Sequence, residues 1–465
     1  MIFIQMKFVR RCLLGAMFGL AGSGQLLAQQ QSLSPVPLRD AEQLSLSLPQ
    51  AIALAVARNY DLKIAGSAVQ SSVAAERIAA AAPNPMVTLQ TTGVNPKNGI
   101  GAGNLRSKSI DSALRVDQLV ERGGKRELRQ ESAAHLRDAA RADFHDTQRQ
   151  LGIAVSQAYY ELLAAQEKRE ILKQSASLYG NTINAARQRQ KAGDLAGADL
   201  ARLQVDALRS SNEALLSETD VLKASQALSL LLGQAAGAPR IRLADSWPAA
   251  IVSSNAVATV AMPPEEIIAH RADVVAAAAR LDAAIATRQL ALASRSRDVA
   301  LGVQYEHYPV TASNGQGSGN SLGFFVQVPL FVRSYFEGEI GVAEAAIDSA
   351  RATLAKTREQ AAAELWQNQQ ELAAYVELIQ RYDNSLLVAA KKSADAAEFA
   401  FRHGAIGIMD VLDTRRTYQA IELDALSARS AYAKSLSAWQ VNWQANLYPD
   451  LQANLQTNLH QAQFP

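Results

Sequence analysis

Apolar residues recur along most of the chain at spacings of three and four positions, the pattern of long helices packed in coiled coils. A helix predicted from Gly124 to about Lys191 would be about 100 Å long at ~1.5 Å per residue, which is too long for a compact domain. The next helix carries a seam of apolar and small side chains at Leu200, Leu203, Ala207, Ser210, Ala214, Ser217, Val221, Ala224, Leu228 and Leu231. The pattern predicts a mainly α-helical chain.

This helical pattern occurs twice. The segments QRQKAGDLAGADLAR (188–202) and FRHGAIGIMDVLDTRR (401–416) align when Gly193 is placed on Gly404, which also places Asp199 on Asp410. Each reads as a sharp reversal between two helices, because glycine permits the left-handed backbone that ends a helix and an early carboxylate favours the next helix dipole. We predict two copies of one long helical hairpin.

Four shorter segments alternate apolar and polar residues with a period of two, which predicts strands. Each has roughly the ten residues that a tilted membrane strand needs, with one apolar face. Four strands cannot close around a passage, and an open edge leaves unpaired backbone groups in lipid. We therefore expect four transmembrane strands per chain, a 12-stranded barrel formed by a homotrimer, and helical hairpins that continue it as a coiled-coil barrel.

The N-terminus has the layout of a secretory signal peptide, with Lys7, Arg10 and Arg11 before an apolar run. After it, no apolar run approaches the length of a membrane helix. We expect a signal peptide at 1–28 and a first repeat at 29–233, with strands at about 86–94 and 109–118 and a tip at 190–200. A linker at 234–262 then leads to a second repeat at 263–445, with strands at about 298–308 and 321–331 and a tip at 402–411. A polar tail follows at 446–465.

Composition excludes several classes of function. The chain has 46 basic and 44 acidic residues, and loss of the signal peptide leaves it almost neutral, so a nucleic-acid partner has no electrostatic support. Cys12, the single cysteine, lies in the signal peptide, which excludes disulfides and thiolate metal sites from the mature protein. No histidine pair has the i,i+4 spacing of a metal site, and no catalytic constellation stands out. We expect no metal site, no cofactor and no enzymatic activity.

Two motifs carry a resemblance to a known family. The order of helix, strand, loop, strand, long helix, tip and helix, given twice, resembles the TolC family of outer-membrane efflux proteins. DQLVERGGKRELR (117–129) resembles the strand-to-helix passage of its heavy-metal branch, the cobalt-zinc-cadmium and copper-silver systems. GAIGIMDVLD (404–413) resembles the second tip of the family.

The resemblance implies a trimeric exit duct in the outer membrane of a Gram-negative bacterium, with a long periplasmic helical part. Its partners would be outer-membrane lipid, a periplasmic adaptor protein and an inner-membrane RND pump. It also implies that Asp410 and Asp413 face the periplasmic entrance as a ring of carboxylates. Phe401 and Ile406 stand where family members often have a tyrosine and an arginine that hold this entrance shut.

For both candidate sites a simpler interpretation exists. Asp410 and Asp413 also suit the first turns of any helix. Exposed apolar residues at a hairpin end need a partner, which favours adaptor docking, although the turn alone explains the glycines. The candidate docking residues are Gly193, Leu195, Gly197, Gly404, Ile406 and Gly407.

Other functions remain open at this point. Drug efflux and type I protein secretion use the same kind of duct, so the cargo is not decided. A periplasmic adaptor would have one hairpin beside separate β-domains, and a secreted hydrolase would need a catalytic constellation.

Overall fold

The computed structural model describes residues 44–94, 110–234, 241–249, 265–308 and 319–443. All of these residues belong to a single structural unit. The predicted signal peptide and polar tail lie outside the described residues, as does most of the predicted linker.

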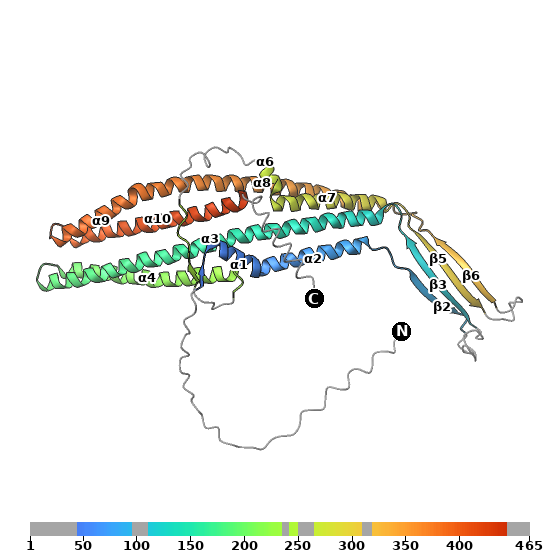
Figure 1. Ribbon diagram of the computed structural model, residues 1–465, viewed down its shortest axis with the longest axis horizontal. Coiled ribbons are helices and arrows are strands. Elements are labelled where there is room, and N and C mark those ends of the chain that lie inside the picture. The colour runs from blue at the N-terminus through green and yellow to red at the C-terminus, as the bar shows by residue number, and fades with distance from the viewer. Residues whose placement is uncertain (1–43, 95–109, 235–240, 250–264, 309–318, 444–465) are drawn as a thin grey trace, which may run out of the picture. The chain divides into compact units, whose positions relative to one another are not determined.

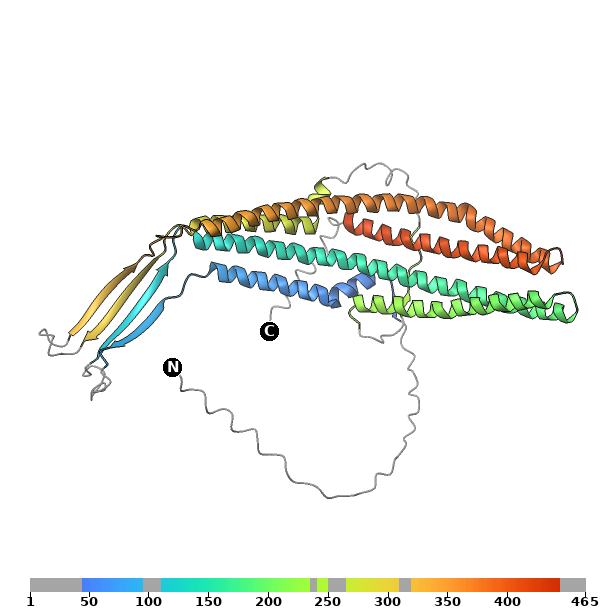
Figure 2. The same ribbon diagram turned by 180° about the vertical axis from the view of Figure 1, so that it is seen from behind.

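The described part is mainly helical with a small amount of strand, as predicted (Figure 1). Helix α3 lies beside α2, α4, α7 and α10, while α8 lies beside α7 and α10 (Figures 1 and 2). The elements in chain order are β1 (Leu44–Leu46), α1 (Leu48–Arg58), α2 (Tyr60–Ala80), β2 (Met86–Thr92), β3 (Asp111–Val120), α3 (Lys125–Lys191), α4 (Gly197–Leu231), β4 (Ile241–Leu243), α6 (Glu265–His270), α7 (Ala272–Ala293), β5 (Val299–Tyr308), β6 (Gly319–Gln327), α8 (Glu337–Arg381), the π-helical turn η2 (Tyr382–Leu386), α9 (Leu387–Arg402) and α10 (Ile408–Trp443).

Helix α3 runs for 67 residues without a break and forms the axis of the first repeat. It begins after Gly123 and Gly124, whose φ angles of 79° and 69° turn the chain out of β3. A Cβ on Gly123 would lie 2.7 Å from Ser296 Oγ, so this turn also requires a small residue. The glycine pair therefore forms the bend between strand and helix.

The predicted seam of α4 is confirmed. Seven of its ten positions are buried, among them Leu203 and Leu228, and the other three are half-buried. These side chains face α3 and build a continuous coiled-coil interface.

The pattern misses three helix interruptions. Asn59 separates α1 from α2, caps α2 through its side chain, and donates from Nδ2 to Leu231 O at 3.1 Å. Arg271 separates α6 from α7 at the equivalent place in the second repeat. The π-helical turn η2 interrupts the second long helix, which the 3-4 spacing predicts to be continuous.

Strands β2, β3, β5 and β6 form one antiparallel sheet in that order. Leu114 pairs with Leu89 and Tyr305, and Val303 pairs with Phe324, so the apolar residues of the four strands share one face. The bounds of all four differ from the predicted segments by only a few residues. A second sheet, which the sequence analysis misses, is the parallel pair β1 and β4.

Residues 241–249, which we call the strap, cross α3 and join distant helices. Leu48 N donates to Asp245 Oδ2 at 2.7 Å, and Trp247 Nε1 donates to Glu167 Oε2 at 2.5 Å. At the far end Tyr432 on α10 donates to Ala249 O at 3.1 Å. The strap thus fastens α1 and α10 to α3 at mid-length.

Candidate functional site at the hairpin tips and the sheet

The two hairpin tips have the same backbone geometry. Gly193 and Gly404 adopt φ angles of 84° and 74°, which L-residues with a side chain rarely adopt. The amides one residue later, of Asp194 and Ala405, each donate to a carbonyl five positions back at 2.9 Å, which satisfies the end of the helix. Gly197 then begins α4, and Gly407 directly precedes α10.

The apolar residues of the tips are less exposed than expected. Leu195 is half-buried on a cluster that both hairpins share, and Ile406 is half-buried as well. We call this group the tip cluster; its buried members are Tyr179, Ala186, Leu200, Leu203, Ile408 and Leu412. Leu195 and Ile406 therefore keep only part of their surface free for an outside partner.

Polar contacts also join the two hairpins near their tips. Arg416 on α10 pairs with Asp206 on α4 at 2.5 Å, and this contact is the main reason that the pKa of Arg416 is raised. The guanidinium of Arg189 lies 4.9 Å from the centre of the Phe401 ring. Phe401 thus packs against residues of its own chain, on the tip cluster and beside Arg189. The sequence analysis missed Arg416 and Asp206, because each looks like an ordinary solvated helix residue.

The structure places Asp410 and Asp413 in the first two turns of α10, both exposed. Their neighbours Val411 and Leu412 are buried, so the two carboxylates lie away from the tip cluster. Within the described part of the chain neither carboxylate is paired with a basic side chain, although Arg415 pairs with Glu398 close by. Two negative charges therefore stay available at this end of the molecule.

The opposite end of α3 leads into the sheet, whose two faces differ sharply. On one face eleven large apolar side chains are each at least 42% exposed. They are Val87, Leu89, Leu114, Val116, Val120, Leu301, Val303, Tyr305, Leu322, Phe324 and Val326. So large an exposed apolar surface needs an apolar environment or a partner.

The other face of the sheet is mainly polar. It carries Thr88, Gln90, Arg115, Asp117, Gln304 and Glu306. Its large apolar side chains among the described strands are Met86, Leu119, Tyr308 and Phe325. A sheet with one apolar and one polar face can separate lipid from water.

A buried charge cluster fixes the passage from sheet to helix. Lys125, 9% exposed, donates from Nζ to Asp298 Oδ1 at 2.8 Å and to Ser296 O at 2.7 Å. Burial opposes the ionisation of Asp298, yet the Lys125 ammonium and the Arg122 amide hold its pKa below the ordinary value. Beside this cluster, Arg129 donates two hydrogen bonds to the Glu121 carboxylate. The motif 117–129 thus contains the residues that join the two repeats at this junction.

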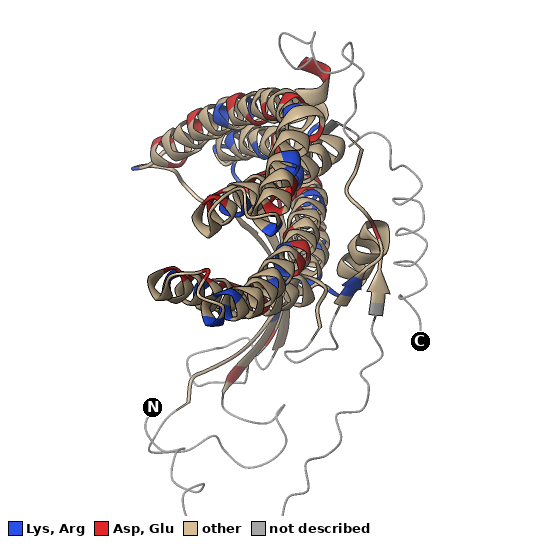
Figure 3. Cartoon of the chain, turned by 90° about the vertical axis from the view of Figure 1, so that its left-hand side faces the viewer, with Lys and Arg blue, Asp and Glu red and all other residues tan. Residues whose placement is uncertain are grey.

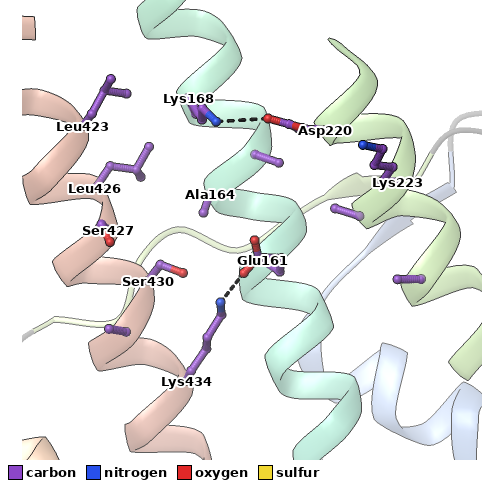
Figure 4. A pocket seen from close by; sticks show the side chains of 14 residues that line it. Glu161, Ala164, Lys168, Asp220, Lys223, Leu423, Leu426, Ser427, Ser430 and Lys434 are labelled. Atoms are coloured by element: carbon purple, nitrogen blue, oxygen red, sulfur yellow. Dashed lines mark hydrogen bonds and ion pairs between the residues drawn. The ribbon is translucent and has the colours of Figure 1, made fainter. Parts of the chain in front are cut away.

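No metal site emerges from the part of the chain that the structure describes, where no three His, Cys, Asp or Glu side chains gather. None of the described helices has both the length and the apolar character needed to cross a membrane. Basic and acidic residues are interspersed along the helices (Figure 3).

Comparison with known proteins gives consistent results. The outer membrane efflux protein family matches residues 51–234 and 264–439. The chain is 25% identical over 396 residues to the cobalt-zinc-cadmium resistance protein CzcC of Cupriavidus metallidurans, covering 83% of this chain and 87% of that protein. It is 26% identical over 446 residues to the pyoverdine export outer membrane protein OpmQ of Pseudomonas putida, covering 86% and 87% of the two chains.

Solved structures show the same fold. The crystal structure of CusC superposes with a TM-score of 0.70 at 17% identity, and the match covers 91% of this chain and 99% of that one. The helical hairpins, the two-faced sheet and the family match over both repeats lead to one conclusion: the chain is an outer-membrane protein that belongs to the outer membrane efflux protein family.

Proposed function

We propose that this protein is the passive exit duct of a tripartite efflux system that exports heavy-metal cations. It works as a homotrimer and docks with a periplasmic adaptor protein and an inner-membrane RND pump. The observation that carries the proposal is the sheet with one mainly apolar, exposed face at the end of a helix about 100 Å long, at ~1.5 Å per residue. The apolar face contacts outer-membrane lipid, and the hairpins reach into the periplasm.

The two outer strands of the sheet support the homotrimer. Among the described strands, β2 and β6 each pair on one side only, and in lipid an unpaired edge leaves backbone groups without partners. Three copies placed edge to edge give twelve strands and a closed wall. Chemical cross-linking of the purified protein in detergent should give a trimer, and a lone monomer in outer-membrane vesicles would contradict the closed wall.

The cargo assignment is supported by the likeness to CzcC and by motif 117–129. Deletion of the gene should lower tolerance to cobalt, zinc or cadmium, and a plasmid copy should restore it. OpmQ, a pyoverdine exporter, is about equally similar, so export of organic compounds is the second candidate. Normal metal tolerance together with lost tolerance to organic toxicants would favour that candidate.

We place the periplasmic gate at Asp410 and Asp413. In a trimer six such carboxylates would face one another, repel when empty, and bind cations. Replacement of both residues by alanine should abolish block of the channel by divalent cations in single-channel recordings. Asp424→Ala, an exposed aspartate farther along α10, serves as the control and should leave the block intact. If the double variant is still blocked as the wild type is, the gate is elsewhere.

Docking of the adaptor at the tips is supported by their exposed small residues, Gly193, Gly197, Gly404 and Gly407, which leave backbone accessible. Leu195 and Ile406 would support these turns from within. A cysteine can be introduced as Ala405→Cys at the second tip and as Ser211→Cys on the outside of α4, both at exposed positions. A thiol cross-linker should capture the adaptor from position 405 and not from position 211. Equal capture at both positions would argue against tip docking.

A further inference from the structure

The polar face of the sheet carries an arrangement of charges that the proposed gate does not involve. Its charged side chains among the described strand residues are three carboxylates, Asp111, Asp117 and Glu306, and one guanidinium, Arg115. We infer that this face is a second cation-selecting wall of the duct, in which Glu306 acts as an open charge while Arg115 is neutralised by Asp117. The inference rests on the proposed function, because only a duct has an inner wall.

The ion pair of Arg115 and Asp117 lies flat on the sheet. Arg115 Nε donates to Asp117 Oδ1 at 2.8 Å, and the guanidinium carbon lies 4.4 Å from the centre of the Phe325 ring. The two side chains are only 28% and 19% exposed. The guanidinium is therefore held by a carboxylate on its own strand and an aromatic ring on β6, and it does not extend into the water-filled space.

Two glycines make this flat arrangement possible. A Cβ on Gly302 would lie 2.2 Å from Asp117 Oδ1, and one on Gly323 would lie 3.3 Å from the Phe325 ring. Asp117 pairs with Gly302 across β3 and β5, and Gly302 pairs with Phe325 across β5 and β6. The backbone thus leaves the space that the ion pair and the ring occupy.

Glu306 has a different environment. It lies opposite Ala113 on β3 and Ser321 on β6, neither of which carries a charge. Gln304 Nε2 lies 3.5 Å from the Glu306 carboxylate, which is a long and weak hydrogen bond. Three copies of this open carboxylate would give the inner wall a negative potential, and such a potential raises the local concentration of cations.

The wall can be tested by the reversal potential of the purified protein in planar bilayers under a potassium chloride gradient. Glu306→Gln should lower the ratio of potassium to chloride permeability roughly two- to fivefold at about 0.1 M salt, where charges act over ~10 Å. Asp117→Asn should lower it at least as much, because it removes a carboxylate and leaves Arg115 without its partner. At 1 M salt, where charges act over only ~3 Å, these differences should largely disappear.

The double variant Arg115→Gln with Asp117→Asn is the matched control. It removes the whole ion pair without a change of net charge, so it should keep the wild-type permeability ratio. Wild-type ratios in both Glu306→Gln and Asp117→Asn channels would overturn the inference and leave the duct itself intact. A wild-type protein that forms no channels would instead overturn the proposed function.

Discussion

Removal of one hydroxyl from Tyr159 tests how the strap is held. Tyr159 on α3 is 0% exposed, and its hydroxyl lies 3.0 Å from both Leu46 O and Asp245 Oδ2. The amide of Asp245 also donates to this hydroxyl at 3.3 Å. Burial raises the pKa of Tyr159 far above its ordinary value, so the hydroxyl stays protonated at every pH of interest. One atom therefore links β1, the strap and α3.

Tyr159→Phe keeps the ring and deletes only these hydrogen bonds. A buried polar group left without its partner costs about 1–3 kcal/mol. If the strap opens locally, that cost corresponds to a roughly 5- to 150-fold faster amide exchange, since each 1.4 kcal/mol is tenfold. The amide of Ala244, which donates to Leu46 O at 2.9 Å, is the most direct reporter.

The assay is hydrogen–deuterium exchange with mass spectrometry on the detergent-solubilised protein. Faster exchange should appear in β1 and the strap, which includes β4, and not in the sheet formed by β2, β3, β5 and β6. Tyr160→Phe is the control, because the Tyr160 ring stacks on Trp247 at 6.0 Å and would be retained. If Tyr159→Phe exchanges at the wild-type rate in the strap, the hydroxyl does not hold it.

Three further outcomes are expected. Leu203→Ala in the tip cluster, at 0% exposure, should destabilise the tips by about 2–5 kcal/mol. Leu208→Ala on the outer face of the same helix, at 67% exposure, should change stability by less than about 0.5 kcal/mol. Equal effects of the two substitutions on amide exchange at the tip would refute the packing. Gly124→Ala should lower stability by about 1–2 kcal/mol through backbone strain alone, because φ is 69° and a Cβ there would clash with no other atom. Gly338→Ala in the first turn of α8 should be neutral or stabilising. Exchange of the Leu128 amide, which donates to Gly124 O, measures the first effect. Because the pKa of Asp298 is lowered, its contribution to stability is present above the ordinary carboxyl pKa of 3.8 and is lost as the pH falls through the lower folded value. Asp298→Asn should therefore destabilise the junction at neutral pH and remove this acid-dependent loss of stability. Thermal unfolding measured from pH 5 to pH 2 tests both effects.

Features set by local periodicity could be predicted from the sequence, and features set by distant contacts could not. The seam through Leu203 and Leu228 and the bend at Gly123 follow from side-chain size and spacing alone. The pairing of β1 with β4 joins three-residue strands almost 200 positions apart, too short for any alternation to be visible. The turn η2 adds one irregular step, from the half-buried Tyr382 to the half-buried Leu387, and a single such step is hard to separate from the regular spacing on either side.

At the candidate site the same division holds. The glycine turns were predictable, because a sharp reversal requires a left-handed residue at Gly193 and Gly404. The half-burial of Leu195 reflects its packing on the tip cluster, to which the second hairpin contributes Ile408 and Leu412. Asn59 did carry a local signal, since asparagine is a preferred N-cap residue, but the helical pattern on both sides obscured it.

The contrast between α3 and its counterpart has a mechanical consequence. An uninterrupted helix behaves as a stiff rod, whereas a π-helical turn is a point where a helix bends. A force applied at the first tip is therefore carried along α3 to Gly123 and the sheet, while the same force at the second tip is taken up by flexing at Tyr382–Leu386. The two hairpins, alike at their tips, are thus expected to differ in compliance, with the second yielding more readily than the first.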